Sequence, residues 1–383
     1  MNQISLSASL NRCFMRFENR AERLEPEQIV DTFVSVGPLL DVLSAPANQI
    51  MYGRRGTGKT HALKYFLADR TNAGDVAIYV DCQNIGSNQS IYDDGALPIS
   101  ERATRLLVDV CSAMHWAFLD AFSDPKRGWS LAEAGPLLNS VTDAISEVRI
   151  IGPIERSTDT KAAISSSSGL SLGGTASAAP EAHIKLELND TMNTSAETHD
   201  KASGTEVSAL DFNFLTQTLR RLAGFVHPKR IWLLIDEWST VPADIQPYLA
   251  DLLRRSFFSI PNVTLKIAAI EHRSKFKIDL DDGHYVGFEL GADISPAINL
   301  DDYLVFDNNE SRATQFFRTL IANHTIGISK EIGVDLSSLS TSSLVANSFT
   351  QENVFVEFVR ATEGVPRDAM HILVNAGLFN ALN

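Results

Sequence analysis

The segment at residues 53–60 has residue types and spacing that suit phosphate binding. It reads Gly-Arg-Arg-Gly-Thr-Gly-Lys-Thr and matches the pattern GxxxxGK[ST]. In such a loop the glycines let backbone N–H groups close around phosphates, the lysine places a charge on the β and γ oxygens, and the last hydroxyl ligates Mg²⁺. We therefore predict a site for ATP made by Gly53, Gly56, Thr57, Gly58, Lys59 and Thr60, with Lys59 also catalytic and Thr60 also a metal ligand.

Two further assignments come with this loop. The helix that follows it would add the positive end of its dipole to the phosphates. His61, the next residue, is included among the nucleotide-binding residues, with simple packing or solvent exposure as the alternative. The other interpretation of the loop, a glycine-rich turn with an incidental lysine, is disfavoured, because a chance match in a chain of this length has odds of about one in a hundred.

A pair of acids follows a continuous apolar run at residues 231–235. Such a run is typical of a strand that is buried on both faces of a sheet. Asp236 at its end would hold Mg²⁺, usually through water, and Glu237 would orient and polarise the attacking water. We predict Asp236 as a metal ligand and Glu237 as a catalytic residue.

The elements that must position these residues alternate between strand and helix. Apolar runs predict strands, and periodic apolar positions predict helices, the longest of them capped by Ser100. Together with the loop at residues 53–60, this alternation predicts an α/β fold, a P-loop NTPase with a mostly parallel sheet flanked by helices. The helical pattern after Pro296 predicts a small second domain, which the resemblance described below would make an α-helical lid domain. The expected strands are 48–52, 76–80, 230–235, 263–270 and 285–290, and the expected later helices are 212–222, 248–257, 312–321, 354–359 and one opened by Pro366.

The composition changes at residues 157–208, which are rich in Ser, Thr, Ala and Gly. Little apolar surface is available there to offset the entropy of ordering, so we expect an insertion with a mobile base. Within it, residues 183–188 alternate strictly between apolar and polar types, and Leu170 and Leu172 could pair with them. The insertion is therefore also a candidate β-hairpin.

Composition and charge exclude several classes of protein. The chain has 383 residues, 44% hydrophobic and 21% charged, which disfavours collagenous, disordered and coiled-coil proteins. No apolar run approaches the roughly 20 residues of a transmembrane helix, and no signal peptide is recognisable, so we expect a cytoplasmic protein with no membrane partner. Three dispersed cysteines exclude a disulfide framework.

The net charge of -14 is unevenly distributed along the chain. Residues 279–310 hold nine acids and no Lys or Arg, whereas residues 220–277 hold ten Lys or Arg against five acids.

The two motifs, together with residues 263–270 and the sequence Gly-Val-Pro-Arg at residues 364–367, resemble AAA+ ATPases. The resemblance is strongest to the origin-recognition initiator clade, whose lid helix often begins with Gly-x-Pro-Arg, and it covers residue 33 onwards apart from the insertion. It implies an N-terminal extension at residues 1–32, an ATPase core at residues 33–295 that contains the insertion, and a helical lid at residues 296–383.

The same resemblance assigns further residues. Arg367 matches the sensor-2 arginine that reads out nucleotide in the lid. The sensor-1 position lies at Glu271 or His272, where the family usually has Asn, Thr or Ser. The arginine finger that a neighbouring subunit would insert is assigned to Arg273 as a catalytic residue, with Arg254 and Arg255 as competitors. Since only 16 residues follow Arg367, we expect no winged-helix domain and no sequence-specific DNA binding by that route.

These observations give a first hypothesis and two alternatives. The first is an AAA+ ATPase that hydrolyses ATP with Mg²⁺, forms a homo-oligomer and switches a partner effector such as a nuclease or toxin, a setting implied by initiator-like ATPases of bacterial anti-phage defence and mobile elements. The second is a nucleotide-binding scaffold without hydrolysis. The third is an ATP-dependent protein that binds DNA backbone non-specifically through the basic stretch.

Overall fold

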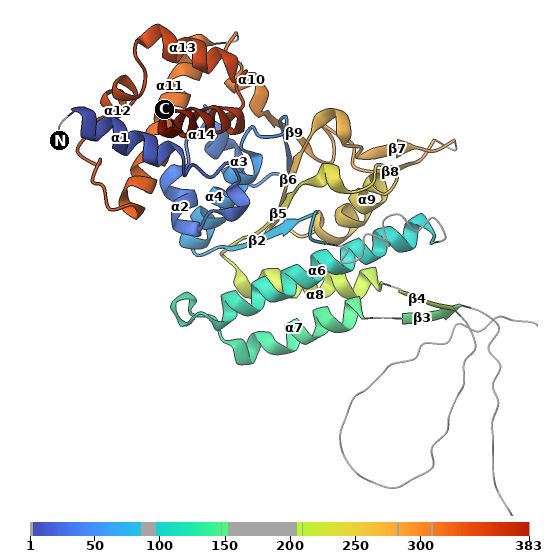
Figure 1. Ribbon diagram of the computed structural model, residues 1–383. Coiled ribbons are helices and arrows are strands. Elements are labelled where there is room, and N and C mark those ends of the chain that lie inside the picture. The colour runs from blue at the N-terminus through green and yellow to red at the C-terminus, as the bar shows by residue number, and fades with distance from the viewer. Residues whose placement is uncertain are drawn as a thin grey trace, which may run out of the picture.

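The computed structural model describes residues 3–85, 97–146, 148–151, 205–208, 210–281, 283–307 and 309–382. A five-stranded sheet with the order β2-β5-β6-β1-β9 forms its centre, and each described strand pair in it is parallel (Figure 1). The α/β architecture with a parallel sheet flanked by helices is thereby confirmed. The strands are β1 (Gln49–Tyr52), β2 (Val76–Asp81), β5 (Ile231–Asp236), β6 (Val263–Ala269) and β9 (Ser295–Asn299).

Helices cover both faces of this sheet, which explains why β5 is apolar throughout. Successive strand side chains point to opposite faces. Trp232 and Leu234 therefore pack in a cluster with α4, whereas Leu233 and Ile235 pack in the largest core cluster with α6 and α9. The helices on the first face are α2 (Pro26–Thr32), α3 (Leu39–Ser44) and α4 (Lys59–Asn72), and those on the second are α6 (Ile99–Ser123) and α9 (Gln246–Phe257).

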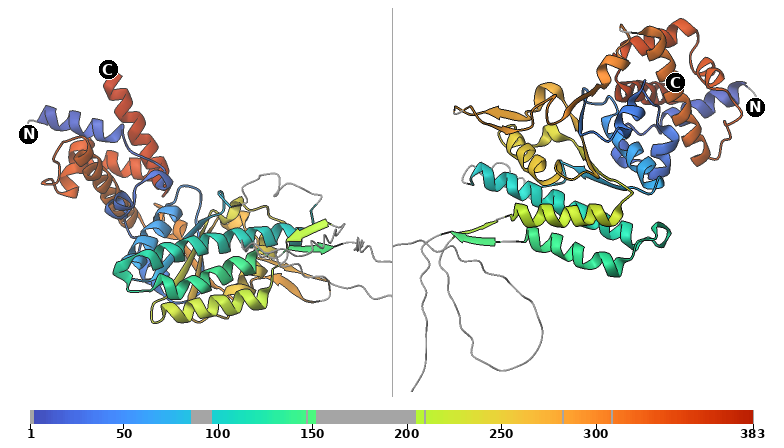
Figure 2. Two further views of the ribbon diagram at one scale, coloured as in Figure 1. Left: turned by 90° about the horizontal axis from the view of Figure 1, so that it is seen from below. Right: turned by 180° about the vertical axis from the view of Figure 1, so that it is seen from behind.

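A further helical layer lies outside α6. There α7 (Leu131–Ile145) packs between α6 and α8 (Phe212–Val226), below the sheet in Figure 1 and again side by side in Figure 2. By length and composition alone, α6 is the one described helix that could cross a membrane, yet its apolar face is buried in the core. The prediction that Ser100 caps this helix is wrong, because α6 starts at Ile99 after Pro98 and has no side-chain cap.

Two small antiparallel ribbons stand apart from the main sheet. In one, β3 (Val148–Ile151) pairs with β4 (Thr205–Ser208), so the last residues of the predicted insertion form a strand. The candidate hairpin at residues 183–188 lies outside the described residues. In the other, β7 (Lys277–Asp279) pairs with β8 (Tyr285–Gly287). The strand that we expected at residues 285–290 is thus short and outside the parallel sheet.

The fifth strand of the sheet, β9, was not predicted. It contains Pro296, which cannot donate a ladder hydrogen bond and is tolerated at a sheet edge. β9 spans the position where we placed the boundary between core and lid. It leads directly into α10 (Leu300–Leu304), the short helix that connects the sheet to the lid helices.

The helices after α10 fall in the region that we expected to be a lid, and we call them the lid; they form a unit with its own hydrophobic cluster. The expected helices at 312–321, at 354–359 and after Pro366 lie within α11 (Glu310–Glu331), α13 (Glu352–Ala361) and α14 (Pro366–Leu382), respectively. Unexpectedly, α1 (Gln3–Phe14) packs in the same cluster through Leu10, Cys13 and Phe14, beside α14 (Figures 1 and 2). The lid also contains α12 (Thr341–Ser348).

Candidate functional site

The loop between β1 and α4 has a backbone shape that its glycines permit. Gly56 and Gly58 have φ angles of 89° and 94°, a region that residues with a Cβ rarely adopt. Gly58 directly precedes α4. The first N–H groups of a helix have no intrahelical partner, and the positive end of the helix dipole lies beside them. The loop therefore offers the donors and the field that a phosphate group needs.

Lys59 is the first residue of α4, and its side chain is buried. Its Nζ donates hydrogen bonds to the carbonyl oxygens of Gly53 at 2.9 Å and Arg54 at 3.0 Å. Burial lowers the pKa of Lys59, and the negative charges of Glu237 and Asp236 oppose that effect. Charged phosphate oxygens are stronger acceptors than these carbonyls, so a bound phosphate would compete for the ammonium group.

Asp236 stands at the carboxyl end of β5 with no exposed surface. One of its carboxylate oxygens accepts a hydrogen bond from the Tyr79 hydroxyl at 2.8 Å, and the other accepts one from the Glu237 N–H, also at 2.8 Å. Each carboxylate oxygen has two lone pairs. The carboxylate is thus held in one orientation, and each of its oxygens keeps a second lone pair that these two bonds do not use.

Glu237 follows in a left-handed backbone conformation with φ 51°. Non-glycine residues occupy this region at a cost, and they are found at functional sites more often than elsewhere. Burial and the neighbouring Asp236 raise the pKa of Glu237, against the opposing charges of Lys59 and Arg55. A carboxylate with a raised pKa is a better proton acceptor.

The residues predicted to hold Mg²⁺ provide oxygen donors only. Thr60 lies in the first turn of α4 and contributes a hydroxyl, and Asp236 contributes a carboxylate. In the part of the chain that the structure describes, no group of three or more His, Cys, Asp or Glu side chains could hold a metal by itself. Mg²⁺ usually takes one or two protein ligands and completes its shell with water and phosphate, and this donor set fits that habit.

One cleft between the core and the lid is lined by several of these residues, but Asp236 is not among them. The walls of the cleft come from the loop and α4, from Glu237 directly after β5, from the lid, and from the segment that precedes α2. The lining includes Glu18, Asn19, Ala21, Glu22, Leu24, Arg55, Gly56, Gly58, Lys59, Thr60, His61, Glu237, Leu320, His324, Pro366, Arg367 and Met370. The structure therefore brings Lys59, Thr60, Glu237 and Arg367 together around one space.

His61 lies at the edge of this cleft, and its ring nitrogen is already engaged. Nε2 donates to the carbonyl oxygen of Ile29 at 2.9 Å. Burial lowers the pKa of His61, and burial lowers the pKa of the neighbouring His324 to about 3. Both rings are consequently neutral at pH 7. His61 links α4 to α2, which agrees best with the packing alternative for this residue.

Arg367 occupies the start of α14 against the phosphate-binding loop. Its N–H donates to the carbonyl oxygen of Gly56 at 3.3 Å. A Cβ on Gly56 would come within 2.9 Å of the Arg367 Cβ, so only a glycine lets the two segments approach this closely. The Nε of Arg367 is a buried polar atom with no hydrogen-bond partner among the described residues. Such an orphaned donor in a cleft calls for an acceptor.

The predicted finger arginines lie away from the cleft. Arg273 is exposed in the short helical turn Glu271–Arg273, together with both candidate sensor-1 residues, Glu271 and His272. Arg254 forms an ion pair with Asp251 at 2.7 Å, and Arg255 pairs with the same carboxylate at 3.8 Å. For Arg273, the described residues provide no ion pair, so it is the most available of the three to another molecule.

No sequence pattern indicated three features of this site: Tyr79, Arg55 and the wall before α2. Tyr79 pairs with Leu234 across β2 and β5, which puts it on the same sheet face as Asp236. The alternation of side chains along β2 could have placed Tyr79 on one face of the sheet, but it does not give the register of β2 against β5. Arg55 belongs to the motif and raised no expectation because its position there is variable. The segment around Leu24 carries no motif.

Comparison with known proteins finds a similarity over part of the chain. A family model described as ORC-CDC6-like matches residues 17–76. This range contains the wall before α2, β1, the phosphate-binding loop and α4. The match supports a relationship to ORC/CDC6-like AAA+ proteins and, through it, nucleotide binding. Among curated proteins, none matches the chain at a significant level.

Proposed function

We propose that this protein is an AAA+ ATPase that binds ATP with Mg²⁺ and hydrolyses it. The observation that carries the proposal is the arrangement in one cleft of the Lys59 ammonium, the Glu237 carboxylate and the orphaned Nε of Arg367. In parallel α/β sheets, ligands bind beyond the carboxyl ends of the strands. Lys59 follows the loop after β1 and Glu237 follows β5, so both lie at those ends, and Arg367 faces them from α14.

Each residue has a role that follows from its position. Lys59 would exchange its two carbonyl partners for β- and γ-phosphate oxygens, and the loop N–H groups would hold the remaining charge. Thr60 and Asp236 would hold Mg²⁺, which when bound neutralises charge on the phosphates. Arg367 would contribute its free donor from the lid. Together these groups bind and orient the triphosphate.

Glu237 would act on the water. Its carboxylate would orient a water molecule for attack on the γ-phosphorus and accept the proton as the bond between that phosphorus and the β–γ bridging oxygen breaks. Its raised pKa and its place in the cleft support this role. The products are ADP and phosphate.

We further propose that the protein works as a self-associating switch on a partner protein. The exposed Arg273 would then enter the cleft of a neighbouring copy and stabilise transition-state charge. The concentration of acids at residues 279–310, against the basic balance of residues 220–277, supports contact between unlike faces of two copies.

Steady-state ATP hydrolysis by wild type, Lys59→Ala and Glu237→Gln tests the catalytic assignment. Loss of Lys59 should weaken ATP binding and turnover together, whereas Glu237→Gln should keep binding and lower turnover by roughly 100-fold or more. Glu357→Gln, an exposed lid residue, is the matched control. Equal activity in wild type and both cleft variants would refute the assignment.

One observation favours a second candidate, a scaffold that binds nucleotide without hydrolysing it. Glu271 and His272 stand where the related proteins usually have a small polar residue, and neither lines the cleft. In that case ATP would co-purify intact and stabilise the protein against heat. Multiple turnover of ATP by wild type, lost in Glu237→Gln, would decide against the scaffold.

A further inference from the structure

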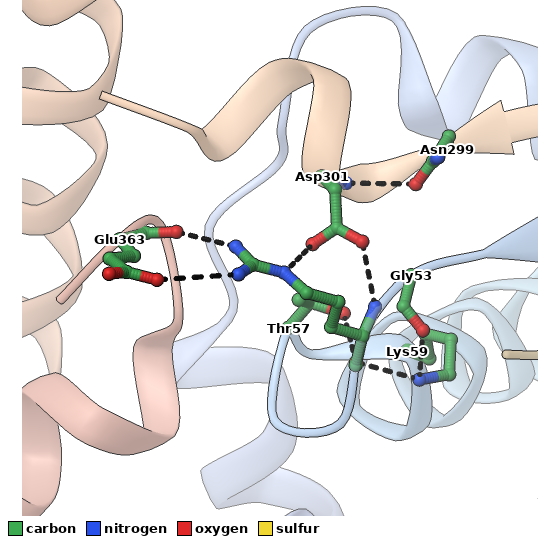
Figure 3. Close-up of polar contacts among 7 residues, drawn as sticks. Gly53, Thr57, Lys59, Asn299, Asp301 and Glu363 are labelled. Atoms are coloured by element: carbon green, nitrogen blue, oxygen red, sulfur yellow. Dashed lines mark hydrogen bonds and ion pairs between the residues drawn. The ribbon is translucent and has the colours of Figure 1, made fainter. Parts of the chain in front are cut away.

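Arg54, the second residue of the phosphate-binding loop, directs its side chain toward the connection between core and lid. Its backbone N–H donates to Oδ2 of Asp301 at 2.9 Å, and its Nε donates to Oδ1 of the same carboxylate at 3.0 Å. Asp301 belongs to α10, and its own N–H is held by the side chain of Asn299 at 3.1 Å (Figure 3). Both donors of Arg54 thus converge on one fixed carboxylate.

The far end of the same guanidinium reaches the loop before α14. An Nη donates to the carbonyl oxygen of Glu363 at 2.7 Å, and the Glu363 carboxylate lies 3.6 Å from the other Nη (Figure 3). Glu363 and Gly364 both have left-handed φ angles, 50° and 78°. A Cβ on Gly364 would overlap the backbone carbonyl of Leu304 at the end of α10. This loop is therefore packed tightly on α10, and Arg54 bridges the two.

The loop that Arg54 holds leads directly to Arg367. Because Arg367 also bonds to Gly56, the start of α14 is attached to the phosphate-binding loop at two points, through Gly56 and through Arg54. The carbonyl of Arg54 in addition accepts the Lys59 ammonium. One residue thus touches the phosphate-binding lysine with its backbone and the lid with its side chain.

We propose that Arg54 is a positioning residue that sets the lid over the phosphate-binding loop and so places Arg367 for nucleotide. This rests on the proposed function, since it gives the regulation of the same site. The contact with Asp301 is the main anchor, because the Asp301 side chain is 20% exposed whereas that of Glu363 is 79% exposed, and exposed ion pairs contribute little. Arginine suits the task because its planar fork can serve several acceptors at once.

Hydrogen exchange without nucleotide tests the attachment itself. In Arg54→Gln, amides of the Glu363 loop and the start of α14 should exchange roughly 10-fold faster than in wild type, as expected for the loss of charge-assisted hydrogen bonds. Arg105→Gln, which breaks a helical ion pair with Glu101 away from the cleft, is the matched control and should leave these amides unchanged. Unchanged exchange in Arg54→Gln would overturn the proposal, whatever the protein does with ATP.

Binding of a fluorescent ATP analogue tests the route through Arg367. Arg54→Gln should weaken binding roughly 10-fold, and Arg54→Lys should weaken it nearly as much, since an ammonium cannot reproduce the fork. In an Arg367→Ala background, Arg54→Gln should have little further effect. The positioning role would be overturned if the losses in affinity caused by Arg54→Gln and Arg367→Ala were additive. It would also be overturned if Arg54→Lys bound the analogue as well as wild type does. Wild type that fails to bind the analogue would refute the proposed function, and the exchange experiment would still decide whether Arg54 holds the lid.

Discussion

At the scale of single residues, Tyr79 shows how the site depends on groups outside the motifs. Its hydroxyl donates to the buried carboxylate of Asp236, and burial together with that carboxylate raises the pKa of the phenol well above its usual range. The phenol is thus always neutral and always a donor. Its role is to keep one carboxylate orientation, which is the kind of support that outer residues give metal ligands.

Tyr79→Phe tests this role. Loss of the hydroxyl should raise the Mg²⁺ concentration needed for half-maximal ATP hydrolysis and for half-maximal binding of a fluorescent ATP analogue, roughly 5- to 20-fold, since outer-shell losses typically cost 10- to 100-fold in metal affinity. Tyr65→Phe on α4 is the control, because its ring stacks on Phe33 and does not contact Asp236. An unchanged Mg²⁺ dependence in Tyr79→Phe would remove Tyr79 from the site.

At the scale of elements, the passage from sheet to lid is tightly packed. β9 leads into α10, and the loop before α14 rests on the end of α10 at Gly364. Only glycine avoids both the strain of φ 78° and the overlap with the Leu304 carbonyl. The close packing of this loop on α10 therefore depends on the absence of a side chain at Gly364.

A pair of glycine substitutions measures this dependence. Gly128 has a comparable φ of 71°, but a Cβ there would meet open space. Gly128→Ala should lower the free energy of unfolding by about 1–2 kcal/mol, the cost of the left-handed backbone. Gly364→Ala should lower the free energy of unfolding by about 1–3 kcal/mol more than Gly128→Ala does, because the added methyl group would overpack the contact with Leu304. Urea denaturation provides both values, and equal losses would mean that the loop relaxes away from α10.

The elements also show what local patterns can and cannot predict. Local patterns predicted three elements at the positions where the structure has them: the loop at residues 53–60, the apolar strand β5 and the helix opened by Pro366. Each of these patterns involves only residues that are neighbours in the sequence. β9 escaped prediction because five residues with a proline carry no strand signal of their own. Its place is decided by pairing with β1, a contact distant in sequence.

The candidate site also has a part that local sequence patterns predict and a part that they do not. The motifs indicated the loop residues, Asp236, Glu237 and Arg367, and the structure gathers Lys59, Thr60, Glu237 and Arg367 at one cleft. The bond from Tyr79 to Asp236 and the one from Arg54 to Asp301 join residues 157 and 247 positions apart. Periodicity within a window has no information about such pairs.

At the scale of the whole molecule, self-association would complete the site. Arg273 is exposed and does not line its own cleft, so under the proposed mechanism its charge would act on another copy. ATP turnover per molecule should therefore rise with protein concentration, and Arg273→Ala should lower kcat by roughly 10³-fold at high concentration while leaving ATP affinity nearly unchanged. Arg255→Ala is the control, because Arg255 pairs with Asp251 within its own chain. Turnover independent of concentration would rule out a finger in trans.

The packing of α1 against α11 and α14 has a consequence for the order of events during translation. The apolar face of α1 leaves the ribosome well before its partner helices α11, α12 and α14, the first of which begins at residue 310. Domains form as they are synthesised, and contacts between distant segments close late. The nascent chain must therefore shield Leu10 and Phe14 until the lid helices exist, and the cleft acquires its last wall, α14, only after the sheet is in place.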